Sequence, residues 1–145
     1  MNYRTFLIIC CFFFFDCQSA VSPEGRFVDT HGGTEPFESF FQRFCKDPIF
    51  QLERIKFPLK ITEWEFETEQ INIEYLPKSK WEHHSFYDEE SFAKRELDAY
   101  KQSIQAYQDT MKLELRGIDN GIYVDFHFLP EGAKWFLIEK KDYSD

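Results

Sequence analysis

Apolar and polar residues alternate along the last part of the chain, and this alternation is the clearest structural signal in the sequence. Residues 122–128 follow the two-residue period of a strand that buries one face. A second apolar run covers residues 135–138, and residues 130–132 supply a Pro-Glu-Gly turn between the two. Another turn at residues 119–121 leads back to a strand around residues 112–115. The chain is therefore predicted to end in a meander of three antiparallel strands.

Earlier in the chain the hydrophobic period is that of a helix. Thr34 is the expected N-cap of a first helix, with Pro36 in the first turn. Phenylalanines at positions 37, 40, 41 and 44 then share one helix face. Asp47 and Pro48 end this helix and begin a second short one through residue 52. The phenylalanine face predicts helices that pack on a sheet.

The middle of the chain returns to strands. Residues 55–61 alternate, and Pro58 places this strand at a sheet edge or at a bulge because proline cannot donate a ladder hydrogen bond. Residues 71–75 alternate again. Asp88 is expected to cap a helix that extends to about Ile104. The elements together predict an α+β domain, in which helices cover one face of a curved, mainly antiparallel sheet.

The first twenty residues differ in character and predict an export signal. Arg4 precedes an apolar run, residues 6–15, that is too short to span a bilayer as a helix. Signal peptidase could cut after Ser19 or Ala20; alternatively, Cys17 could be the lipidated first residue of a bacterial lipoprotein. Asp16 departs from the residues usual before such a cysteine. The protein is thus expected in the periplasm, or at the outer membrane through a lipid anchor.

Length, charge and cysteine content bear on the domain organisation, on the possible partners and on the role of Cys45. A tether over residues 21–33 and a single domain over residues 34–145 are expected from the length and pattern. The 26 acidic and 17 basic residues give a net charge of −9, which argues against nucleic acid and against an anionic membrane surface as partners. Cys45 is the one cysteine of the expected domain, and its apolar helical setting favours a buried residue over a nucleophile.

Three stretches resemble a family of small exported bacterial proteins of unknown function, many of which look like lipoproteins. They are FFQRFCKDPIFQLERIKFPL (40–59), KWEHHSFYDEESFAKREL (80–97) and GAKWFLIEKKDYS (132–144). This family is similar to the nuclear-transport-factor-2-like (cystatin-like) superfamily. The resemblance implies a cone-like α+β fold whose curved sheet wraps a long pocket, with N-terminal helices on one face. It carries no catalytic residue over to this chain.

Asp125 and His127 are the candidate catalytic pair. They are two residues apart on a predicted strand and therefore share one face, where a carboxylate orienting an imidazole forms a general base. The same residues form the polar side of a regular alternation, which commonly meets solvent or a second subunit. Orientation separates these hypotheses, because a catalytic pair must be enclosed in a pocket.

Two further groups of residues are candidates for binding. His83 and His84, with Glu82 and Asp88, could hold a metal, but adjacent histidines point in different directions and no zinc-type Cys/His spacing is present. We therefore predict no metal site. Trp81 lies in an irregular segment and is the candidate residue at the mouth of a ligand pocket.

No Gly-rich phosphate loop, nucleophile elbow or paired-cysteine motif occurs in the sequence, and no cofactor is predicted. We predict a non-catalytic protein of the cell envelope that binds a small ligand or a protein partner. The alternative is a small isomerase or hydrolase that uses Asp125 and His127 inside the cone. A third possibility is a homodimer formed through the exposed sheet face.

Overall fold

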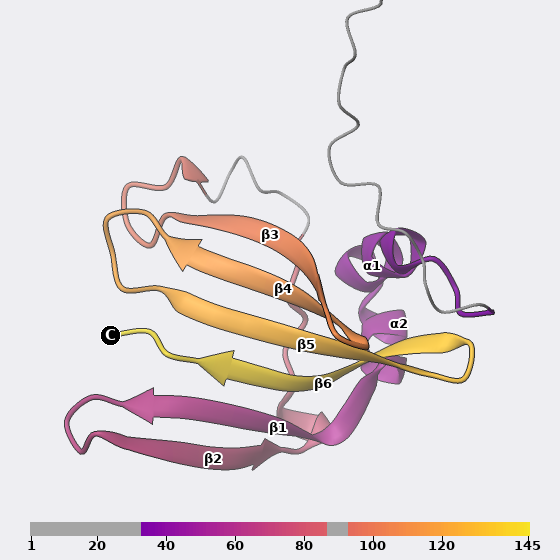
Figure 1. The fold of residues 1–145 in the computed structure, drawn as a ribbon, viewed down its shortest axis with the longest axis horizontal. Coiled ribbons are helices and arrows are strands. Elements are labelled where there is room, and N and C mark those ends of the chain that lie inside the picture. Colours follow the sequence, from indigo (N-terminus) through magenta and orange to yellow (C-terminus); the bar gives the residue numbers. More distant parts are fainter. Residues whose placement is uncertain (1–32, 87–92) are drawn as a thin grey trace, which may run out of the picture.

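The computed structural model describes residues 33–86 and 93–145, which form two helices, one 3₁₀ turn and six strands (Figure 1). The predicted export signal lies outside the described residues. In these two ranges no helix has the length and apolar character needed to cross a membrane. The elements in chain order are α1 (Phe37–Lys46), α2 (Pro48–Glu53), β1 (Ile55–Glu65), β2 (Gln70–Leu76), η1 (Lys78–Lys80), β3 (Tyr100–Tyr107), β4 (Thr110–Gly117), β5 (Tyr123–Glu131) and β6 (Lys134–Asp142).

All six strands belong to one sheet, in the order β2-β1-β6-β5-β4-β3. Neighbouring strands are antiparallel except β1 and β6, which run parallel. The predicted meander over the last three strands is confirmed. The prediction of a mainly antiparallel sheet with helices on one face is confirmed as well. Figure 1 shows both helices close to the end of the sheet where β5 passes into β6.

The two helices form where the sequence predicts them, with one correction at the start of α1. Asp47 caps α2, because its Oδ1 accepts hydrogen bonds from the backbone N–H groups of Ile49 (3.1 Å) and Phe50 (3.0 Å). Thr34 is not the N-cap of α1. The helix begins at Phe37, Pro36 occupies the cap position, and the Thr34 hydroxyl instead lies 3.5 Å from the carbonyl oxygen of Gly132.

Phe128 on β5 lies at the centre of an aromatic core between sheet and helix. Its side chain has no exposed surface. Its ring centroid lies 5.4–6.0 Å from those of the four α1 phenylalanines, which meet it edge-on at angles of 73–87°. The α1 residues are Phe37, Phe40, Phe41 and Phe44. This packing confirms that the helix face and the strand face read from the sequence are the ones that meet.

The predicted helix that reaches Ile104 is wrong, because residues 100–107 form strand β3. The expected cap, Asp88, lies outside the described residues. Leu97, which the predicted helix would bury, is 80% exposed. The alternation of half-buried Tyr100 and Ile104 with exposed Lys101 has the period of a strand, and β4 supplies the hydrogen-bonding partner. Hydrogen bonding to β4 therefore makes residues 100–107 a strand, although their apolar residues also fit a weak helical period.

Pro58 lies at an irregularity of β1 rather than at a sheet edge. β1 is an inner strand that pairs with both β2 and β6. Its ladder with β2 begins at Leu59, and its register with β6 shifts between Ile55 and Lys60. The proline is therefore accommodated where the regular ladder is interrupted, which is the bulge alternative of the sequence prediction.

Candidate ligand-binding pocket and outer sheet face

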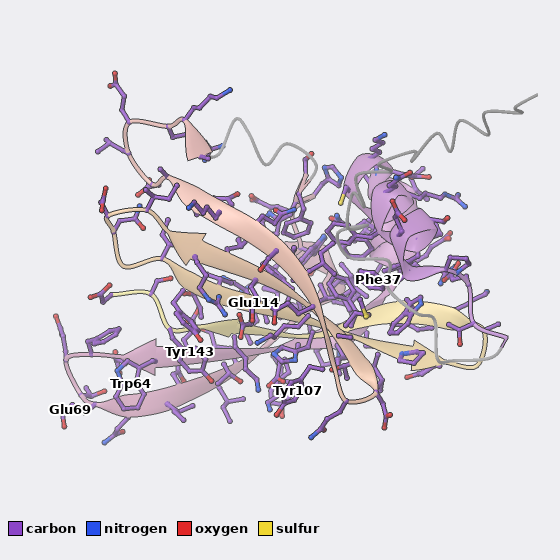
Figure 2. The ribbon with its side chains drawn as sticks, turned by 45° about the horizontal axis from the view of Figure 1, so that its top comes forward. Phe37, Trp64, Glu69, Tyr107, Glu114 and Tyr143 are labelled. Atoms are coloured by element: carbon purple, nitrogen blue, oxygen red, sulfur yellow. The ribbon has the colours of Figure 1, made fainter. Side chains whose placement is uncertain are left out.

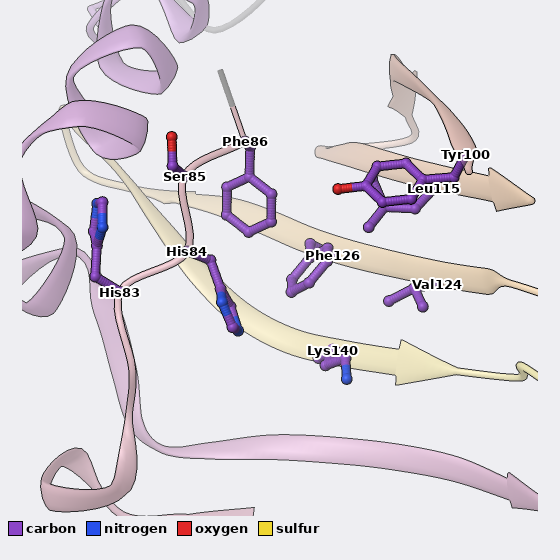
Figure 3. Close-up of a pocket in the computed structure, with 9 residues that line it drawn as sticks. All are labelled: His83, His84, Ser85, Phe86, Tyr100, Leu115, Val124, Phe126 and Lys140. Atoms are coloured by element: carbon purple, nitrogen blue, oxygen red, sulfur yellow. The ribbon is translucent and has the colours of Figure 1, made fainter. Parts of the chain in front are cut away.

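A pocket of about 290 Å³ lies between one irregular segment and the helix-facing side of the sheet (Figure 3). Residues 83–86 form one wall of it. The sheet contributes residues from four strands, namely Tyr100 (β3), Leu115 (β4), Val124 and Phe126 (β5) and Lys140 (β6). No sequence motif marks this site, because its residues come from five separate segments.

The bottom of the pocket is apolar and its rim is polar. Leu115 and Val124 are paired across β4 and β5, and both are buried. Phe126 packs edge-on against Phe86, with ring centroids 4.9 Å apart and an interplanar angle of 66°. Polar atoms come from the side chains of His83, His84, Ser85, Tyr100 and Lys140. An apolar floor with a few polar groups is the usual composition of a small-molecule site.

Gln51 on α2 holds the wall of this pocket in place. Its side chain is fully buried, and its Nε2 donates to the carbonyl oxygens of Phe44 (2.9 Å) and His84 (2.8 Å). Its Oε1 accepts hydrogen bonds from Trp81 Nε1 (3.0 Å) and from the backbone N–H of His84 (3.1 Å). Both donors and both acceptor positions of the amide are therefore used. We call this arrangement the Gln51 clamp.

Trp81 lies beside the pocket and does not line it. Its ring contacts His84, a lining residue, at a centroid distance of 5.0 Å, and Phe57 at 6.3 Å. The hydrogen bond to Gln51 fixes its indole against the domain. Its contact with His84 places Trp81 behind the pocket wall. A direct role of Trp81 in ligand binding stays a prediction.

Asp125 and His127 lie on the outer face of the sheet, opposite the pocket. Val124, Phe126 and Phe128 of the same strand face the helices, so the alternation directs the pair away from them. Glu114 pairs with Asp125 and so lies on the same face; in Figure 2 it is seen near the middle of the sheet, with Trp64 toward the β1–β2 hairpin. The catalytic alternative requires an enclosed pair, and neither residue lines the pocket.

Asp125 belongs to a network of ion pairs on this outer face. Its Oδ1 accepts a hydrogen bond from Arg116 Nη2 at 2.6 Å, and its Oδ2 lies 3.5 Å from Lys112 Nζ. Lys112 also contacts Glu114 at 2.5 Å. Burial raises the pKa of Glu114, but the hydrogen bond from Lys112 and the nearby Arg116 outweigh it, so that this pKa lies below its ordinary value. The Asp125 carboxylate is thus engaged by cations from β4 rather than by His127.

His127 is held in a setting that favours its neutral form. Its Nε2 is buried and has no hydrogen-bond partner among the described residues. Burial lowers the pKa of His127, and the positive charge of Lys141 lowers it further. The charged groups around it are Asp125 on the same strand, Lys112 on β4, and Glu139 and Lys141 on β6.

We expect His127 to make the fold sensitive to mild acid. Since the unfolded chain takes up a proton at this residue near pH 6.5 and the folded chain only at lower pH, stability is lost as the pH falls below about 6.5. Urea unfolding at pH 7.5 and 5.5 measures the loss, and His127→Gln should reduce it. An equal loss in the variant and the unaltered protein would contradict this account of His127.

The structure buries Cys45 and places His83 and His84 at the pocket. Cys45 is buried, and burial raises the pKa of its thiol to about 12, so that it stays protonated and unreactive, as the prediction of a buried residue implies. His83 and His84 both line the pocket, with their rings on opposite sides of the backbone in Figure 3. Over residues 33–86 and 93–145 no group of three or more His, Cys, Asp or Glu side chains is arranged to hold a metal ion.

Comparison with known proteins supports the fold and leaves the family open. No established protein family and no curated protein matches the chain. Among solved structures, a nuclear-transport-factor-2-like protein from Bacteroides fragilis is 24% identical with a TM-score of 0.55; the match covers 77% of this chain but about half (48%) of that one. A cystatin-like protein from Bacteroides caccae is 23% identical with a TM-score of 0.52, over 74% of this chain and 76% of that one.

A protein from Bacteroides uniformis is similar to the same degree, with 22% identity and a TM-score of 0.52. At these identities the likeness shows the fold alone. The described domain therefore has the nuclear-transport-factor-2-like (cystatin-like) α+β fold that the resemblance implies. The narrower resemblance, to a family of exported lipoproteins, stays a prediction.

Proposed function

We propose that this domain is a non-catalytic binding protein for a small ligand and that its site is the pocket between residues 83–86 and strands β3–β6. The observation that carries the proposal is the composition of that pocket, in which buried Leu115, Val124 and Phe126 form an apolar floor below polar side chains. Its volume of about 290 Å³ suits a molecule at the small end of the ligand range. The solved structures with this fold are consistent with such a domain and name no ligand.

Screening of a fragment library by ligand-observed NMR tests this function. Leu115→Phe adds bulk to the pocket floor and should abolish binding of the hits, whereas Leu97→Phe makes the same change at an exposed position and should leave it intact. Circular dichroism verifies that both variants are folded. Hits that bind Leu115→Phe as well as the unaltered protein would contradict the proposed site.

We further propose that the protein is exported and works in the cell envelope. The basis is the charged and apolar pattern of the first twenty residues, together with Cys17 at a position where a lipid anchor could be attached. Intact mass of the protein produced in a Gram-negative host with its own leader tests this. A diacylglyceryl- and acyl-modified chain beginning at Cys17 supports an anchor, a chain beginning near Ala20 supports free secretion, and an unprocessed chain contradicts export.

A second proposal is that two copies associate through the outer sheet face. Ile71, Ile73 and Tyr75 on β2 are 50–62% exposed and lie on the same face as Trp64, which pairs with Ile71. On this face β2 presents only Ile71, Ile73 and Tyr75 and no charged side chain, so two copies related by a twofold axis can pack their β2 strands together without like charges meeting between those strands.

Sedimentation velocity tests this association. Ile73→Lys should raise the dimer Kd roughly tenfold or more, because the new ammonium group would lose its water in the interface. Asn72→Lys adds the same charge one residue away on the opposite face and should leave the dimer intact. A protein that sediments as a monomer at all concentrations would contradict the proposal.

A further inference from the structure

The pocket differs from the rest of this protein in its charge. The chain carries 26 acidic and 17 basic residues, yet no carboxylate is among the described residues that line the pocket. The lining instead holds the ammonium group of Lys140, two imidazoles and two hydroxyl groups. Such a set of hydrogen-bond donors, with an ammonium group among them, favours a ligand that brings a negatively charged hydrogen-bond acceptor.

Lys140 is positioned to meet that charge. It pairs with Phe126 across β5 and β6, so its side chain leaves the sheet on the pocket side. Its Nζ lies 2.9 Å from Asp142 Oδ2, and this ion pair takes one of the three ammonium protons. Two donors therefore remain for a ligand, while Asp142 holds the chain in place. Asp142 itself does not line the pocket.

The other end of the pocket suits a flat apolar group. The rings of Phe86 and Phe126 meet edge-on at 4.9 Å, and His84 contacts Phe86 at 5.9 Å. Figure 3 shows Tyr100 extending toward Phe86 from the opposite side. A ligand ring placed against these rings gains both apolar burial and the edge-to-face geometry that aromatic groups prefer.

We infer that the pocket selects a small aromatic carboxylate, with the carboxylate at Lys140 and the ring against Phe86 and Phe126. This inference rests on the ligand-binding function proposed above and adds the chemical class of the ligand. It concerns the side of the sheet that holds the pocket, and it does not involve Asp125 or His127.

His84 makes this binding depend on pH. Partial burial lowers the pKa of His84, and the positive charge of Lys140 lowers it further. The negative charge of a bound carboxylate stabilises the protonated imidazole and so opposes these effects, so that His84 takes up a proton on binding and affinity increases as the pH falls. The titratable and charged groups facing it are Lys140 from β6, Tyr100 from β3 across the pocket, Glu82 and His83 from its own segment, and Asp142 through Lys140.

The test compares three probes of one shape by isothermal titration with the purified full-length protein: phenylacetate, the neutral phenylacetamide and the cationic phenethylamine. Phenylacetate should bind most tightly. Lys140→Gln should weaken it by about tenfold or more, as expected for loss of a charged hydrogen bond. The matched control is Lys141→Gln, which removes the neighbouring ammonium on the outer face and should leave the affinity unchanged.

The pH dependence gives a second readout. Phenylacetate stays ionised above pH 5 because carboxyl groups titrate near 4, so a gain of about threefold or more from pH 7.5 to 5.5 reports on the protein. His84→Gln should remove this gain without breaking the Gln51 clamp, since the clamp uses only backbone atoms of His84.

The outcomes separate this inference from the proposed function. Equal affinity for phenylacetate and phenylacetamide, or an unchanged affinity in Lys140→Gln, would overturn the choice of an anion and leave a ligand pocket standing. The same holds if fragments of other chemistry bind the pocket and phenylacetate does not. If no molecule of any class binds there, the proposed function itself fails.

Discussion

Phe128→Ala should destabilise the domain by about 3–5 kcal/mol, the range measured for the loss of a fully buried phenylalanine. Phe128 has no exposed surface, and its ring is surrounded edge-on by the four phenylalanines of α1. Removal of the ring therefore leaves a cavity where α1 packs on β5. Urea unfolding followed by circular dichroism measures the change in the free energy of unfolding.

Phe66→Ala is the matched control, because its ring is 51% exposed and contacts Trp64 at the end of the β1–β2 hairpin. We expect it to change stability by less than about 1 kcal/mol. Similar losses in the two variants would contradict the assignment of the core to the helix side of the sheet.

Gln51→Leu should cost about 3 kcal/mol of stability and release the pocket wall. Leucine fills a similar volume but offers no partner to the carbonyl of Phe44, the backbone of His84 or the indole of Trp81. A buried polar group left without a partner costs about 1–3 kcal/mol, and part of the wall regains water when it moves. Urea unfolding measures the stability, and hydrogen exchange of the residue 81–86 amides measures the release.

Two other variants make this result specific. Gln70→Leu replaces an exposed glutamine on β2 and should be nearly neutral. Trp81→Phe removes only one of the four hydrogen bonds and should have a smaller effect on both readouts than Gln51→Leu. If Gln51→Leu leaves the exchange of residues 81–86 unchanged, the clamp does not hold the pocket wall.

Local chemistry made much of the fold predictable. The phenylalanine spacing of α1, the Asp47 cap and the alternation along β5 each involve residues close in sequence, and the structure forms them as expected. The turn at residues 119–121 likewise connects β4 to β5. Where the residues that determine a helix or strand lie within that element, the pattern of side chains is sufficient to predict it.

Features that depend on distant pairing could not be predicted in this way. Residues 100–107 form strand β3 because they pair with β4. The pocket forms because residues of four strands and one irregular segment come together. The Asp125 network needs the register that sets Lys112 and Arg116 beside β5. Among these features, Gln51 alone has a recognisable position in the sequence, directly after the apolar Phe50 in a short predicted helix. Its hydrogen-bond partners nevertheless come from two other segments and could not be predicted.

The most direct test of the ligand pocket is to map phenylacetate binding on the ¹⁵N–¹H NMR spectrum of the protein. The largest changes in chemical shift should occur at the amides of the lining residues, namely residues 83–86, Leu115, Phe126 and Lys140. These changes should grow with the fraction of protein that has phenylacetate bound. Residues 60–64 and 71–75, on β1 and β2 away from the pocket, should keep their positions. Shifts confined to those two strands, or to Asp125 and His127, would contradict the account, because they would place the binding site on the outer face.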